Sequence, residues 1–102
     1  MVNILYIGRH EDILQTVVRL INNDQNWFGE GAGTYAEAIA KFNAQDYDIV
    51  LLGCGIDAEE EKRLTHYFTE RKPSIKIIQH FGGGSGLLKN EILEALNGRS
   101  IM

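Results

Sequence analysis

The chain has 102 residues, of which 44% are hydrophobic and 24% charged, typical of one soluble globular domain spanning residues 1–102. Its net charge of −4 argues against nucleic-acid binding, which needs a basic surface. The single cysteine, Cys54, excludes an intrachain disulfide and a multi-cysteine zinc site. No apolar run is long enough to span a membrane and no secretory signal is visible, so we expect a cytoplasmic protein without membrane contact.

The first elements along the chain are a strand, a helix and an extended segment. Residues 3–7 form an apolar run ended by Gly8, which is typical of a strand buried on both faces. Residues 11–23 predict an amphipathic helix. Its apolar stripe consists of Ile13, Leu14, Val17, Val18 and Ile21. Residues 27–28 begin a weaker extended segment, which we expect the next three glycines, Gly29, Gly31 and Gly33, to break.

The middle of the chain repeats the alternation of helix and strand. Thr34 followed by Glu37 is a capping pattern and predicts a helix that runs to about Gln45. Residues 48–52 are the strongest strand pattern in the chain and end at Gly53.

A second capping pattern, Asp57 followed by Glu60, predicts another helix, which ends before Pro73. Residues 75–78 then form a further strand. After the glycine-rich stretch 82–86 comes a short apolar pair at residues 87–88, and then a last helix that Asn90 caps and Gly98 closes.

Strands that alternate with helices predict an α/β fold with a parallel sheet covered by helices on both faces. In such open sheets, ligands and chemistry lie at the carboxyl edge. Most of the glycines fall within or just after predicted strands, so several gather at that edge.

In its order of elements and in several short motifs, the chain resembles the CheY-like receiver domain of two-component response regulators. The matching segments are ILYIGRHEDIL at 4–14, TYAEAI at 34–39, YDIVLL at 47–52, KPSIKII at 72–78 and SGLLK at 85–89. The resemblance implies a flavodoxin-like three-layer α/β/α fold and a place in two-component signal transduction, or a phosphorelay.

The resemblance also implies a chemistry, which is phosphoryl transfer to an aspartate. It needs an acidic pair that holds Mg²⁺, an acceptor aspartate, a hydroxyl residue and a lysine. These roles fall on Gly8 and Arg9, on Gly53, on Phe81 (His80 if the register slips by one) and on Lys89. Only the lysine matches. We therefore expect a degenerate pseudo-receiver that is not phosphorylated at the usual site, has no catalytic residue, holds no cofactor and is not an enzyme.

A receiver also has a fourth helix, and the chain has no room for it. Only eight residues separate Ile78 from Leu87, whereas a helical crossover needs about 10–12. We expect this helix to be absent and the sheet to have four or five strands. The uncovered region would then bind a protein partner, either a signalling protein or a second copy in a homodimer.

Two other functions remain open at the predicted ligand edge, where His10, Cys54 and His80 would meet. Cys54 could serve a thiol enzyme or a small carrier similar to the IIB domains of the phosphotransferase system, although in that family the cysteine follows the first strand. The glycine-rich stretch 82–86 could cradle an anion or nucleotide with its backbone N–H groups. The same two histidines and Cys54 are a conceivable metal site, but they show no recognised ligand spacing, and we expect none.

Overall fold

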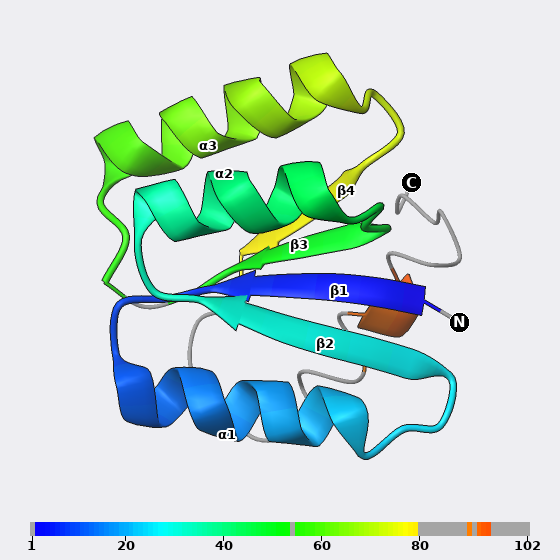
Figure 1. Ribbon diagram of the computed structural model, residues 1–102. Helices are drawn as coiled ribbons and strands as arrows, with labels where there is room; N and C mark the ends of the chain where they lie inside the picture. The colour runs from blue at the N-terminus through cyan, green and yellow to red at the C-terminus, as the bar shows by residue number, and fades with distance from the viewer. Residues whose placement is uncertain (1, 54, 80–89, 91, 95–102) are drawn as a thin grey trace.

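The computed structural model describes residues 2–53, 55–79, 90 and 92–94. Within these ranges, four parallel strands form one sheet in the order β2-β1-β3-β4. They are β1 (Val2–Ile7), β2 (Trp27–Ala32), β3 (Ile49–Leu52) and β4 (Lys76–Gln79). The helices given bounds within these ranges are α1 (Glu11–Asn22), α2 (Tyr35–Ala44) and α3 (Ala58–Arg71), and residues 90 and 92–94 are also helical. Helix α1 covers one face, and α2 and α3 lie together over the other (Figure 1). The predicted three-layer parallel α/β architecture is confirmed.

The sheet is buried on both faces, as continuous apolar strands require. One core lies under α2 and α3 and is built around Leu5, Val50, Leu64 and Phe68. The other lies under α1 and includes Ile4, Tyr6, Ile21, Leu51 and Ile92. Ile92 comes from the helical residues 92–94, so this late part of the chain shares the α1 face.

The expectation that glycines break the extended segment after residue 27 was wrong. Strand β2 runs without interruption through Gly29 and Gly31. Gly29 and Gly31 face α1, and the missing side chains let the helix approach the strand closely. A Cβ atom on Gly31 would lie 2.5 Å from the Leu14 side chain, and one on Gly29 would lie 2.7 Å from that of Ile21. These glycines are therefore packing positions within a strand.

The predicted caps of α2 and α3 are confirmed. The Thr34 hydroxyl accepts the Glu37 N–H at 3.1 Å, and an Asp57 carboxylate oxygen accepts the Glu60 N–H at 2.8 Å. Two smaller expectations were wrong. Ile13 is 40% exposed and does not join the core, and Asn90 is itself helical and so does not cap the last helix.

Polar contacts hold the amino edge of the sheet. A carboxylate oxygen of Asp48 accepts the Asn3 N–H at 2.9 Å, which fixes the register of β1 against β3. The Lys72 ammonium, at the end of α3, donates to the Asp46 carboxylate at 2.7 Å and to the Tyr47 carbonyl at 2.5 Å. Beneath this edge the buried Tyr47 hydroxyl donates to the Glu30 carboxylate.

Burial raises the pKa of Tyr47 well above its usual range, and the hydrogen bond and negative charge of Glu30 raise it further.

Two expectations concern residues outside the described part of the chain. They are the loss of a helix between Ile78 and Leu87 and the fifth strand at residues 87–88. Within the described part, no helix is long and apolar enough to cross a membrane.

Candidate functional site at the carboxyl edge

Gly8 and Gly53 lie side by side where β1 and β3 end. The Gly53 N–H donates to the Ile7 carbonyl at 2.7 Å, which continues the ladder between the two strands. On the other side, the Gly8 N–H donates to the Ala32 carbonyl of β2 at 3.1 Å. The two glycines thus occupy the centre of the carboxyl edge, where the resemblance places the acidic pair and the acceptor.

Tyr6 fills the space in front of both glycines. A Cβ atom on Gly53 would lie 2.0 Å from the Tyr6 hydroxyl oxygen, and one on Gly8 would lie 2.9 Å from the edge of the same ring. The tyrosine is only 1% exposed, so its ring is enclosed by its surroundings. A side chain of any size at position 53 therefore needs Tyr6 to move.

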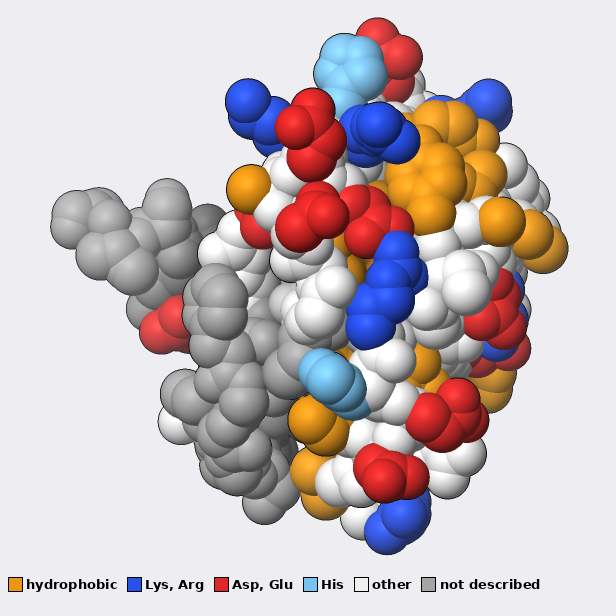
Figure 2. Space-filling view, turned by 90° about the vertical axis from the view of Figure 1, so that its left-hand side faces the viewer, with side chains coloured by type: hydrophobic (Ala, Val, Ile, Leu, Met, Phe, Trp, Pro, Cys, Tyr) orange, Lys and Arg blue, Asp and Glu red, His pale blue; other side chains and the backbone are white. Residues whose placement is uncertain are grey.

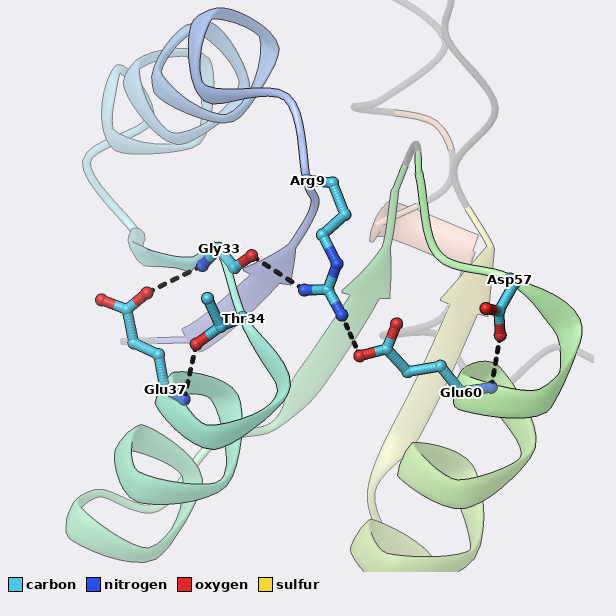
Figure 3. A network of polar contacts seen from close by, with 6 residues as sticks. All are labelled: Arg9, Gly33, Thr34, Glu37, Asp57 and Glu60. Atoms are coloured by element: carbon cyan, nitrogen blue, oxygen red, sulfur yellow. Dashed lines mark hydrogen bonds and ion pairs between the residues drawn. The ribbon is translucent and has the colours of Figure 1, made fainter.

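Arg9 spans the same edge from the end of β1. Its guanidinium donates to the Gly33 carbonyl at 2.8 Å, and it also pairs with the Glu60 carboxylate (Figure 3). The Arg9 side chain is 32% exposed and that of Glu60 16%, so the ion pair is partly shielded from water. One cation therefore connects the β1–α1 turn, the β2–α2 turn and the first turn of α3.

Neighbouring caps hold the two partners of Arg9 in place. The Gly33 N–H donates to the Glu37 carboxylate at 2.8 Å, so both backbone groups of Gly33 are bound by charged side chains (Figure 3). The Glu60 N–H is bound by Asp57, which starts α3. Glu60 therefore points its carboxylate at Arg9 from a fixed helix start.

Gly55 makes room for the Arg9 side chain. Its φ of +82° lies in the left-handed region that favours glycine. A Cβ atom at this position would lie 2.6 Å from the Arg9 Cβ. The path of Arg9 across the edge therefore depends on a glycine in the β3–α3 turn.

The Mg²⁺ that the resemblance implies does not fit these residues. Its ligand positions are taken by Gly8, which has no side chain, and by Arg9, which carries a positive charge. Throughout the described ranges, no group of three histidine, cysteine, aspartate or glutamate side chains could hold a metal ion. Figure 2, which looks onto this edge, shows acidic and basic side chains interspersed across it.

The structure places some of the predicted site residues and leaves others undescribed. Gly8, Arg9 and Gly53 meet at the edge, as expected from the ends of adjacent parallel strands. His10 is exposed and precedes α1 without capping it through its side chain. The other candidates lie outside the described residues, and they are Cys54, His80, Phe81 and Lys89.

Sequence reasoning missed two residues that shape the site. Tyr6 was assigned only to the strand core, yet it stands two residues before Gly8 and so shares its face of the sheet. Glu60 was assigned to a helix cap, and its backbone does take part in that cap while its carboxylate binds Arg9. The alternation of a strand could have suggested the first; nothing in the sequence indicates the second.

The arrangement of strands and helices is that of a CheY-like, flavodoxin-like receiver fold. The chain is similar to a LuxR-family DNA-binding response regulator from Silicibacter pomeroyi, with a TM-score of 0.76 at 19% identity over 97% of this chain and 93% of that one. It is also similar to a CheY-like response regulator receiver domain protein from Methanospirillum hungatei, with a TM-score of 0.70 at 21% identity over 93% and 75%.

A third similar structure belongs to another class. The lactose-specific IIB component domain of the phosphotransferase system from Streptococcus pneumoniae matches with a TM-score of 0.60 at 17% identity, over 95% of this chain and 92% of that one. No protein-family model and no curated protein sequence matches the chain. At these identities, the likeness defines the fold.

Proposed function

We propose that this chain is a pseudo-receiver that works as a protein-interaction module of two-component signalling and carries out no phosphoryl transfer. The observation that supports this most strongly is the position of Tyr6 in front of Gly53. A receiver accepts its phosphoryl group on a carboxylate at that position. Here a buried aromatic ring takes the space, and position 53 has no side chain.

Charge at the edge supports the same proposal. Phosphoryl transfer depends on a metal ion that neutralises the charge of the moving group. Arg9 stands at one of the metal-ligand positions, and its guanidinium is already paired with Glu60. The edge therefore lacks both the nucleophile and the ligand that the reaction needs at these positions.

Incubation with acetyl phosphate and Mg²⁺, followed by mass measurement of the intact protein, tests the proposal. A receiver with its acceptor aspartate, treated in parallel, shows that the reagent is active. We expect that receiver to gain a phosphoryl group and this chain to gain none. An adduct on this chain that hydroxylamine removes would be an acyl phosphate and would contradict the proposal.

We further propose that the interaction partner is a second copy of the chain, bound at the side of the sheet where α3 and β4 lie. All four residues of β4 are partly or fully exposed, whereas all four of β3 are buried. Along α3 runs a shallow hollow of about 600 Å³. Its lining consists of Ala58, Glu61, Lys62, Thr65, His66 and Thr69. Adjacent acidic and basic residues let two antiparallel copies of α3 pair Glu61 with Lys62 across a two-fold axis.

Light scattering over a range of protein concentrations tests self-association. We expect a dimer in the wild type, weakening by Lys62→Glu through repulsion, and recovery in the charge-swapped pair Glu61→Lys with Lys62→Glu. Arg19→Glu, which makes the same reversal of charge at an exposed position of α1, is the control and should leave the dimer intact. A clean monomer at high concentration would rule out a second copy as the partner.

The carrier function remains a second candidate because of the likeness to a IIB domain. In that family the phosphorylated cysteine follows the first strand, where this chain has Gly8. Cys54 follows β3 instead, so the likeness does not transfer a catalytic role to it. Alkylation of the Cys54 thiol across a pH series distinguishes the carrier from the pseudo-receiver. A thiolate that reacts rapidly at neutral pH favours a carrier, and slow reaction favours the pseudo-receiver.

A further inference from the structure

We infer that Arg9 is a built-in cation that fastens the carboxyl edge in place of the divalent metal implied by the receiver resemblance, so that this edge does not respond to Mg²⁺. Whether the domain accepts a phosphoryl group is a separate question, because the fastening involves only side chains and backbone of this chain.

The first argument is the geometry of the guanidinium. An arginine presents several N–H donors in a rigid plane, so it can bind two acceptors in different directions at once. Arg9 uses one terminal nitrogen for the Gly33 carbonyl and the other for the Glu60 carboxylate (Figure 3). A lysine at this position would offer one ammonium nitrogen and could not reach both partners with the same geometry.

The second argument is that the surroundings are shaped for this side chain. Gly55 has a positive φ and leaves the space that the Arg9 stem occupies. The two acceptors are held by their own contacts, Gly33 by Glu37 and Glu60 by its place in the first turn of α3. Three segments from different parts of the sequence thus converge on one cation. An ordinary surface ion pair joins two side chains and needs no such arrangement around it.

The third argument is charge. The first turn of α3 contains Glu59, Glu60 and Glu61, and Asp57 precedes it. This acidic end would attract a divalent cation if it stood alone. Arg9 already supplies positive charge there, and the second ligand position that the resemblance implies is Gly8. An added Mg²⁺ would have to displace the guanidinium from Glu60, and within the described residues no three acidic, histidine or cysteine side chains come together to hold a metal ion.

Hydrogen exchange followed by mass spectrometry tests the fastening in the intact chain. In Arg9→Ala we expect exchange to accelerate about fivefold at the Gly33 and Glu60 amides, with the amides of β1 unchanged. Arg9→Lys should give an intermediate acceleration because it retains the charge and loses one contact. Arg63→Ala removes an exposed arginine from the same helix, α3, and should change neither turn.

A double-mutant cycle between Arg9→Ala and Glu60→Gln measures the pair itself, with Glu59→Gln as the matched control one residue away. We expect the Arg9 and Glu60 changes to be coupled by about fivefold in the unfolding equilibrium constant, and the Arg9 and Glu59 changes to be additive.

Thermal unfolding with and without Mg²⁺ tests the other half of the inference. Millimolar Mg²⁺ should leave the Tm of the wild type unchanged. Unchanged exchange at both turns in Arg9→Ala, or a wild-type Tm that rises with Mg²⁺, would overturn the inference.

Discussion

The two edges of the sheet are held together in different ways. At the amino edge, polar side chains bind backbone groups close to the strand starts, as Asp48 binds the Asn3 N–H and Lys72 binds the Tyr47 carbonyl. At the carboxyl edge, β1, β2 and β3 are each followed by a glycine, and two long side chains, from β1 and from the turn after it, cover the space beside these glycines. Tyr6 fills the space in front of Gly8 and Gly53, and Arg9 reaches across to α3.

The difference teaches that the carboxyl edge is closed by long side chains of the chain itself. The space beside Gly8 and Gly53 is not an open polar pocket. Here the space is occupied by a buried ring, and the charge is supplied from within the chain. An aspartate introduced at position 53 would therefore still meet the Tyr6 ring and lie at an edge that the Arg9 guanidinium spans.

The largest effect is expected from a side chain at position 53. Gly53→Ala would bring its Cβ to 2.0 Å from the Tyr6 hydroxyl oxygen. Because Tyr6 is enclosed, we expect a loss of about 3 kcal/mol in the free energy of unfolding from this overpacking. Urea denaturation followed by circular dichroism measures it.

Gly33→Ala is the matched control at the same edge. Its Cβ would find its nearest neighbours at 3.8 Å, an ordinary van der Waals distance. We expect a change within about 0.5 kcal/mol. Equal costs at the two glycines would mean that Tyr6 moves aside freely, and the carboxyl edge would then be an open site.

At the amino edge, Tyr47→Phe tests a buried hydrogen bond. The substitution removes the hydroxyl that donates to Glu30, and we expect a loss of about 2 kcal/mol near neutral pH. The raised pKa of Tyr47 means that the folded chain retains the phenolic proton. The stabilisation is complete below the unfolded tyrosine pKa of about 10 and is lost as the pH rises from there through the folded pKa.

The advantage of the wild type over Tyr47→Phe should therefore shrink at alkaline pH. Urea denaturation at neutral pH and above the unfolded tyrosine pKa measures this difference, and tyrosinate absorbance follows the ionisation. Tyr35→Phe, which alters a half-buried tyrosine at the start of α2, is the control. A difference between wild type and Tyr47→Phe that stays constant with pH would show that Tyr47 does not retain its proton on folding.

Much of the fold follows from local patterns in the sequence. The alternation of strands and helices predicted the parallel sheet, and the capping residues Thr34 and Asp57 correctly predicted where α2 and α3 begin. Each of these signals lies within a few neighbouring residues. The glycines of β2 were misread because a glycine that breaks a strand and one that lets a helix approach look the same in sequence.

The site was only half predictable for a similar reason. The ends of β1 and β3 could be placed at one edge, so Gly8, Arg9 and Gly53 were correctly assigned to it. What fills the edge depends on side-chain directions and on contacts across long sequence separations. The Arg9 contact with Glu60 spans 51 residues, and no local pattern indicates it.

The smallest effect is expected from the ion pair at the opposite end of α3. The Asp46 side chain is 85% exposed, so water and salt screen its attraction to Lys72. We expect Lys72→Ala to cost about 0.5–1 kcal/mol, mostly through the lost hydrogen bond to the Tyr47 carbonyl. Lys76→Ala, at an exposed position of β4, is the control.

The ion pair at the carboxyl edge should be stronger than the one at Lys72, because Glu60 is only 16% exposed. Arg9→Ala should therefore lower the free energy of unfolding more than Lys72→Ala does, and high salt should reduce this loss less. Equal salt dependence at the two ends of α3 would show that the carboxyl-edge pair is an ordinary surface contact.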